Sequence, residues 1–545
     1  MRAVFGLLAI VIVLSSGCAA SGPNDDGQRW WQHVRVLAAD SLRGRGTATG
    51  DYVRAARYVA AEMKRFGVAP AGDGGSDAVD PAAYFQSVGF TRRVLHENES
   101  SLTLLRDDGT IHLRLGEDAN LSTSSDAQDS VAAPMMFVGY GLSVPEAGYD
   151  DLAGLDLNGK VAMFLRGGPD TLPGPLRASA QTTGIRWKTL RAHGAIGMAS
   201  FTNPKTSDIP WAKATRSRLE PSLSLADSEF IETRGVQLSF RINPAHADTF
   251  LRGTGHTAAE LFALSDKGRP LPTFDVPGRI VGRTRFDQSR IASPNVVGVI
   301  HGSDPALAHE YVIVSAHLDH LGIGPPTARG DSIYNGAMDN ASGVASLLEF
   351  ARFATQPGMT FRRSVILLAV TGEEEGLQGS RYFAARPTVP IDSIVADINV
   401  DMFLPLGPLH RVIVYGNHES DLGDAFAAIA DRADVDVQDD PEPNRRVFTR
   451  SDQYSFIRRG VPSVMVDFGW EPETPSEKHH KDWIAKHYHD PTDDTSQHVN
   501  LEAAAAFNHL LFDFTRQVAN ADARPQWKRA SYFRRYADTT RVAQR

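Results

Sequence analysis

Five short segments of the chain carry side chains that could hold metal ions. They are His317-Leu318-Asp319-His320, residues 335–343 around Asp339, residues 371–376 with three glutamates in a row, Asp401, and Tyr488-His489-Asp490. The donors are imidazoles and carboxylates, because the only cysteine, Cys18, stands close to the N-terminus. A ligand set of nitrogen and oxygen atoms suits zinc, with cobalt or manganese as substitutes.

The residue types in these segments fit the separate tasks of a two-metal centre. His317 is a candidate ligand, and Asp319 can accept the other ring N–H and so fix the tautomer. Two ions held close together need a shared carboxylate, and Asp339 is a carboxylate at the mouth of a predicted helix. A further carboxylate must stay free of metal to take a proton from water. The adjacent Glu373 and Glu374 can supply one base and one ligand.

Buried strands are expected directly before three of these segments. Apolar runs at residues 311–316, 364–370 and 394–400 end just before His317, Thr371 and Asp401. Continuous Val, Ile and Leu runs separated by helices predict an α/β fold with a mixed, mostly parallel sheet and helices on both faces. Ligands bind at the carboxyl ends of the strands in such sheets. The candidate ligands should therefore meet at one edge of the sheet.

Taken alone, each segment has an ordinary structural explanation, such as a surface loop or the N-cap of a helix. Together they resemble the co-catalytic zinc aminopeptidases, a family related to the glutamate carboxypeptidase and transferrin receptor ectodomains. The resemblance rests on five motifs in family order: H-x-D at His317, D-N-x-S-G at Asp339, E-E-x-G-L-x-G-S at Glu373, N-x-D-M at Asn399, and Y-H-x-x-x-D at Tyr488. It covers residues 290–515 and extends to the segment 41–45 near the N-terminus.

This resemblance implies a role for each candidate residue. Two zinc ions per chain are expected, with the following residues: His317 and Asp401 on the first ion, Glu374 and His489 on the second, Asp339 bridging both, Glu373 as general base and Asp319 orienting His317. Gln453 stands where the family often has a histidine after Ser-Asp. This leaves the expected zinc ligands intact, but the pocket wall or the group that stabilises the intermediate is expected to differ from the family. Glu375 is expected at the surface.

The function implied is that of a metal-dependent aminopeptidase acting on peptides with a free N-terminus. Three alternatives stay open: a carboxypeptidase or dipeptidase of the same family, which needs a basic pocket for the substrate carboxylate; a glutaminyl cyclase with one zinc; and a receptor-like ectodomain without activity. The intact Glu373 and the full ligand set argue against the last two.

The chain is long enough for several domains. Residues 131–275 read as a small β-rich insertion that resembles a protease-associated (PA) domain through Phe137 to Gly141, Tyr149 to Asp151 and Gly159 to Val161. The predicted organisation is a signal peptide (1–18), a tether (19–27), the first part of the peptidase domain (28–130), this insertion (131–275), the catalytic domain (276–520) and a polar C-terminal tail (521–545).

The N-terminus has the pattern of an export signal. Arg2 precedes an apolar run of residues 3–14, which is too short to span a bilayer. Leu14-Ser15-Ser16-Gly17-Cys18 resembles a bacterial lipoprotein box, in which Cys18 would be lipidated and would anchor the protein to the outer membrane or cell envelope. Ordinary cleavage, giving a secreted or periplasmic protein, is the alternative. The mild net charge of -9 argues against nucleic acid as a partner.

Overall fold

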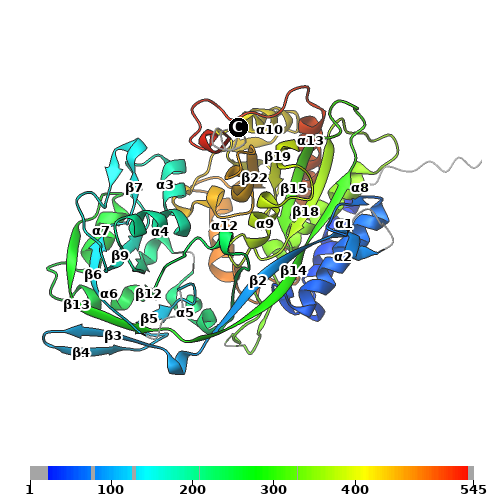
Figure 1. Ribbon diagram of the computed structural model, residues 1–545. Coiled ribbons are helices and arrows are strands. Elements are labelled where there is room, and N and C mark those ends of the chain that lie inside the picture. Colours follow the sequence, from blue (N-terminus) through cyan, green and yellow to red (C-terminus); the bar gives the residue numbers. More distant parts are fainter. Residues whose placement is uncertain (1–22, 75–79, 126–129, 208, 328, 538–545) are drawn as a thin grey trace, which may run out of the picture.

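The computed structural model describes residues 23–74, 80–125, 130–207, 209–327 and 329–537 (Figure 1). The predicted signal peptide, Cys18 and the first part of the tether lie outside these residues. Among the helices of the described chain, none combines the length and the apolar character needed to cross a bilayer.

The larger sheet carries the predicted ligand segments. Its strand order is β11-β2-β14-β18-β15-β19-β22-β20-β21, with β1 paired to β14. The central strands β18, β15, β19 and β22 run parallel, whereas β14, β2 and β11 pair antiparallel on one side. The strands are β1 (Ala69–Pro70), β2 (Phe85–Leu95), β11 (Ser222–Leu225), β14 (Phe286–Ile300), β15 (Tyr311–His317), β18 (Ser364–Val370), β19 (Ile394–Asn399), β20 (Arg411–Tyr415), β21 (Asp436–Gln438) and β22 (Ser463–Phe468).

Helices cover both faces of this sheet, as the apolar runs predict. One face packs against α1 (Pro23–Leu37), α2 (Gly50–Phe66), α8 (Ser342–Ala354), α10 (Asp421–Arg432), α12 (Pro475–His487) and α13 (Leu501–Asn520). The other packs against α9 (Gln378–Ala385) and α11 (Gln453–Ile457). The predicted α/β class with a mixed sheet is confirmed. The sheet is less parallel than predicted: four of its described strand pairings are parallel and five are antiparallel.

Helix α2 shows how local sequence fixes these elements. The Thr49 side chain accepts a hydrogen bond from the Tyr52 N–H and caps the helix start. Tyr52, Val59 and Met63 are buried on one stripe. Gly67 ends the helix in the left-handed region, with a φ of 86°.

A second sheet forms a separate layer at the left of Figure 1. Its strand order is β4-β3-β13-β6-β9-β10-β12-β5. The strands are β3 (Ser101–Arg106), β4 (Gly109–Leu113), β5 (Ala119–Leu121), β6 (Val131–Val138), β9 (Val161–Arg166), β10 (Gly197–Thr202), β12 (Leu238–Ile242) and β13 (Thr273–Arg283), with a small hairpin of β7 (Ser143–Val144) and β8 (Tyr149–Asp150). Its helices are α3 (Gly174–Ala180), α4 (Thr183–Ala192), α6 (Ala247–Leu251) and α7 (Ala258–Asp266).

The two sheets exchange strands across the boundaries expected from the sequence. The second sheet already includes β3, β4 and β5, which precede residue 131, and β13 runs on past residue 275. In the other direction, β11 lies within the expected insertion but pairs with β2 of the larger sheet. The physical reason is backbone pairing: each of these strands satisfies its N–H and C=O groups on a neighbouring strand, whichever side of the expected boundary that strand comes from.

The C-terminal segment is packed where a polar tail was expected. Phe533 is fully buried against Tyr454 and Ile457. The Trp527 indole donates to the carbonyl of Gly460. Aromatic residues spaced along this basic stretch supply the contacts that its overall polarity conceals.

Candidate metal centre

The predicted ligands meet at the carboxyl ends of the central strands. His317 is the last residue of β15, Glu373 and Glu374 follow β18, and Asp401 follows β19. Asp339 lies in the single turn η9 (Ala337–Ala341) that precedes α8, and its peptide bond to Asn340 is cis. His489 arrives from the loop after α12.

The first group of candidate ligands surrounds His317. Its Nε2 lies 3.2 Å from Oδ1 of Asp401 and 3.3 Å from Oδ1 of Asp339. The second group surrounds His489, whose Nε2 lies 3.3 Å from Oδ2 of Asp339 and 3.2 Å from Oε2 of Glu374. Asp339 therefore offers one carboxylate oxygen to each group.

These separations fit zinc coordination. Four donors at about 2.0–2.1 Å from a zinc ion stand roughly 3.3–3.4 Å apart at the corners of a tetrahedron. Oδ2 of Asp339 is buried without an aligned hydrogen-bond partner, which is costly unless a cation faces it. The donor set, the spacing and this unpaired oxygen all fit a metal ion.

The loop that carries Asp339 is fixed from two sides. Asp493, the last residue of the Y-H-x-x-x-D motif, is fully buried and accepts the N–H groups of Met338 and Asp339. The Asn340 side chain donates to the carbonyl of Val400 and accepts from the N–H of Met402, which ties the loop to the segment that carries Asp401. The carboxylate of Asp339 is thereby aimed before any ion binds.

A fully buried arginine lies beneath the centre. Arg45 donates from Nε to the carbonyl of Leu318 at 2.7 Å, and from its other nitrogens to the carbonyls of Leu37, Asn335, Gly336 and Asp339. One guanidinium thus links the loop after β15 with the loop that carries Asp339. Burial lowers the pKa of Arg45 to about 10, against the opposing pull of Asp339 and Asp493, so it stays charged at neutral pH.

Asp319 acts differently from the expectation. The Nδ1 of His317 contacts the main-chain carbonyl of Asp319 at 3.1 Å, rather than its carboxylate. The carboxylate instead accepts the N–H groups of Glu373 and Glu374 and the hydroxyl of Thr47. The reason is geometric: the loop after β18 turns its backbone donors towards Asp319, so the side chain fixes that loop and the main chain orients the histidine.

Glu373 lies beside the first group in a setting suited to proton transfer. Its pKa is raised well above the ordinary value, first by burial and then by the negative charges of Glu374 and Asp401, while His317 opposes the rise. For Glu374, burial would raise the pKa, but the charge of His489 and hydrogen bonds from His320 and His489 lower it to about 2. The two adjacent glutamates therefore have opposite protonation tendencies, as a base and a ligand require.

Gln453, the departure from the family pattern, is fully buried and part of the framework. Its side-chain oxygen accepts from Asn399, and its nitrogen donates to the carbonyls of Val447 and Phe448. The neighbouring Ser451 donates to Oδ2 of Asp401 at 2.6 Å. Gln453 thus supports the strand end that leads to Asp401.

Residues 211–225, here called the crossing segment, lead from the second sheet over to the centre. They include α5 (Trp211–Ala214) and β11. Lys213 donates to the carbonyl of Tyr488, next to His489. The N–H of Leu223 donates to Oε2 of Glu375 at 2.9 Å, so Glu375 is partly buried under this segment and not at the open surface as expected.

Sequence reasoning did not identify Arg45, His320, Asp493 or Lys213 as parts of the centre. The Arg45 segment and the Asp493 position both belong to the quoted motifs, and His320 directly follows the H-x-D motif, so a signal was present for those three. Lys213 had none, because its place depends on how the crossing segment folds back.

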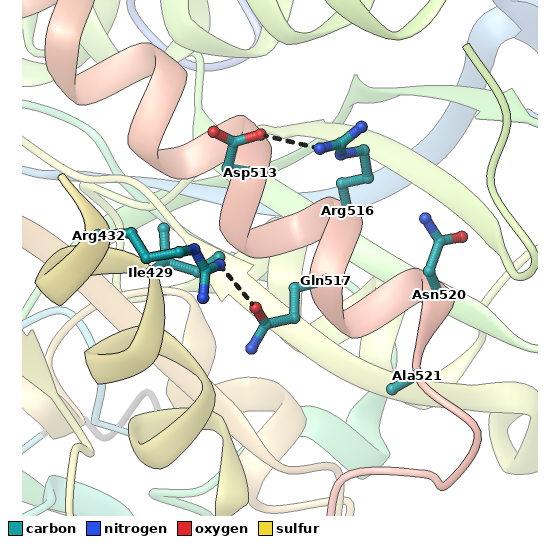
Figure 2. A pocket seen from close by; sticks show the side chains of 7 residues that line it. All are labelled: Ile429, Arg432, Asp513, Arg516, Gln517, Asn520 and Ala521. Carbon is teal, nitrogen blue, oxygen red and sulfur yellow. Dashed lines mark hydrogen bonds and ion pairs between the residues drawn. The ribbon is translucent and has the colours of Figure 1, made fainter.

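A groove between α10 and α13 lies apart from the centre. It has a volume of about 510 Å³ and shares no residue with the candidate ligands (Figure 2). Its arginines are engaged, Arg432 with Gln517 and Arg516 with Asp513. Nothing in it resembles a reactive site.

Comparison with known proteins agrees with the class that the fold and the centre define. Residues 295–515 match the family described as Peptidase family M28. This region, which holds all the candidate ligands and is less than half of the chain, is thus similar to a family of peptidases.

Two of the solved structures that match extend over most of the chain. The match to the aminopeptidase from Aneurinibacillus sp. strain AM-1 covers 91% of this chain and 95% of that protein's chain, at 18% identity and a TM-score of 0.52. The zinc aminopeptidase of Bacillus subtilis covers 91% and 95%, at 16% identity and a TM-score of 0.47. The first of these likenesses establishes the fold.

Among curated proteins, the vacuolar membrane protease of Ajellomyces capsulatus (strain G186AR) is 28% identical over 208 residues, which are 35% of this chain and 20% of that protein. The chain thus spans only a fifth of that relative's length. The expected anchoring in a bacterial outer membrane is wrong on this comparison, because the matching curated relatives are fungal vacuolar membrane proteases. Signal-peptide motifs are short, so a chance match at the N-terminus is easily made.

Proposed function

We propose that this protein is an aminopeptidase that holds two zinc ions and removes residues from the free N-terminus of peptides. The observation that carries the proposal is Asp339, whose two oxygens face two separate imidazoles at 3.3 Å each. His317 and Asp401 would complete the first zinc site, and Glu374 and His489 the second. Two zinc ions held there would lower the pKa of a shared water and polarise the scissile carbonyl.

Glu373 is the proposed general base. Its backbone is fixed by Asp319, so its carboxylate has a defined position beside the first group of ligands. It would take a proton from the attacking water and return it to the leaving amine.

The choice of an aminopeptidase over a carboxypeptidase follows the solved aminopeptidase that shares this fold. The charge of the centre does not decide between the two, because two zinc ions would balance the four carboxylates of Asp339, Glu373, Glu374 and Asp401.

The second sheet is proposed to act as a PA-like insertion that borders the substrate entrance. The contacts of Lys213 with Tyr488 and of Leu223 with Glu375 support this placement. Peptide substrates would then meet both the metal centre and the crossing segment.

Paired substrates test the proposal. A leucyl anilide with a free amine and its N-acetylated twin are given to the purified protein with zinc. We expect hydrolysis of the free-amine form alone, abolished by a chelator and restored by zinc. Failure to cleave either substrate, across a panel of N-terminal residues, would overturn the aminopeptidase assignment.

A further inference from the structure

His320 is a buried imidazole that none of the expected roles uses. It directly follows Asp319, and its side chain is fully buried. Neither ring nitrogen has an aligned hydrogen-bond partner among the described residues. A buried polar ring of this kind needs a partner, and its surroundings show which one.

The ring of His320 lies against the second group of ligands. Its Nδ1 is 2.7 Å from Oε1 of Glu374 and 3.8 Å from Oδ2 of Asp339. The ring is edge-on to that of His489, with centroids 5.9 Å apart. Glu374 therefore faces two histidines, one with each carboxylate oxygen.

The distances to Glu374 indicate different roles for His489 and His320. Donors that share a zinc ion stand roughly 3.3 Å apart, which matches the 3.2 Å between His489 and Oε2 of Glu374. The 2.7 Å between His320 and Oε1 is shorter and falls in the range of a charge-assisted hydrogen bond. His489 has the spacing of a fellow ligand, and His320 has the spacing of a hydrogen-bond donor.

The backbone holds His320 in this place independently of any ion. Its N–H lies 3.4 Å from the carbonyl of Arg45, and His320 forms an isolated parallel β-bridge with Gly46. On the other side, Gly336 packs so closely that a Cβ there would lie 2.5 Å from the ring. The ring is thus clamped between the Arg45 segment and the loop that carries Asp339.

We propose that His320 is a positioning residue for the second zinc site: its Nδ1, 2.7 Å from Oε1 of Glu374, becomes aligned as a donor to that oxygen when Oε2 binds the metal, so that Oε2 alone faces the ion. The inference rests on the proposed two-zinc centre and adds a residue to it. A hydrogen bond to a ligating carboxylate fixes its orientation, and loss of such a partner lowers metal affinity about 10–100-fold.

Two substitutions at this position separate hydrogen bonding from simple packing. His320→Asn places an amide nitrogen close to the position of Nδ1, whereas His320→Leu keeps the branch point and removes the donor. Zinc affinities of the full-length protein are measured by competition with a chelating dye. His418→Leu, at an exposed histidine, is the matched control.

We expect the zinc affinity of one of the two sites to fall about 10–100-fold in His320→Leu, while that of the other site stays unchanged. Both affinities of His320→Asn should be close to those of the wild type. Equal affinities in His320→Leu and the wild type, or equal losses in the Asn and Leu variants, would overturn the proposal. If His320→Leu does not fold, His320→Gln, whose amide nitrogen lies one carbon further out, takes its place with the same expectation. A wild-type protein that binds fewer than two zinc ions would instead count against the proposed function.

Discussion

The two halves of the candidate centre are built in different ways. His317 ends β15, and Asp401 follows the end of the neighbouring parallel strand β19, so the sheet itself sets their separation. Glu374 and His489 come from loops, and His489 has a positive φ of 53°. Their positions depend on side chains from elsewhere, namely His320 and Lys213.

This difference indicates where the centre can be adjusted. A site set by strand ends changes only when the core changes, because buried strands are closely packed. A site set by loops responds to each supporting contact, including those of the crossing segment. Changes outside the ligands should therefore act on the second site and leave the first intact.

The largest effect should distinguish the adjacent glutamates. Glu373→Gln should lower kcat by about 10²–10⁴-fold while both zinc ions stay bound, since it removes the base and no ligand. Glu374→Gln should lose the second zinc as well as activity. Activity assays combined with metal analysis check this, and zinc loss in Glu373→Gln would contradict the assignment.

Replacement of Arg45, the buried cation beneath the centre, tests a contact network that both halves of the centre share. Arg45→Met should lower the free energy of unfolding by about 3–5 kcal/mol, because five carbonyl oxygens lose their donor and nearby carboxylates lose a compensating charge. Chemical denaturation measures the change. Arg43→Met, at an exposed neighbour, is the control, and equal small losses in both variants would refute the role of Arg45.

Much of the centre follows from the sequence for a physical reason. The strands at residues 311–317 and 364–370 are continuous apolar runs, and the carboxyl ends of parallel strands meet at one edge. Ligands placed there, such as His317, can be predicted from local sequence alone. The motif order then indicates which distant loop brings His489.

What could not be predicted depends on contacts between segments far apart in the chain. Asp319 does not have its predicted role because its carboxylate accepts the main-chain N–H groups of Glu373 and Glu374 and not the ring N–H of His317. The crossing segment leaves its own sheet to pair with β2, and no local pattern records such an exchange. The packing of Phe533 is likewise invisible in a stretch whose composition is polar.

A change in the crossing segment should have a smaller effect, confined to the second zinc site. Lys213→Met removes the hydrogen bond to the carbonyl of Tyr488, so His489 loses support and the second zinc should bind about tenfold more weakly. Dye competition on the full-length protein measures this. Lys205→Met, which breaks an exposed ion pair in the second sheet, should change neither site. Weakening of both sites by Lys213→Met would remove the distinction between the halves.

The smallest effect concerns Glu220 in the same segment. Burial raises its pKa from 4.5 to about 7, so the folded state holds a proton that the unfolded state releases. Stability from this group is complete below pH 4.5 and is lost as the pH rises to 7. Glu220→Gln should therefore match the wild type at pH 4.5 and exceed it by about 1 kcal/mol at pH 8, after allowance for solvent screening. Thermal melts of both proteins at the two pH values measure this change in stability. The same difference between Glu220→Gln and the wild type at both pH values would contradict the raised pKa of Glu220.

The number of zinc ions per chain tests the central claim most directly. Mass spectrometric metal analysis of the purified wild-type protein and of Asp339→Asn gives that number. We expect two ions in the wild type and a loss of tight binding at both sites in the variant, because Asp339 serves both halves. A single ion in the wild type, or two ions retained in Asp339→Asn, would contradict a centre built on one shared carboxylate.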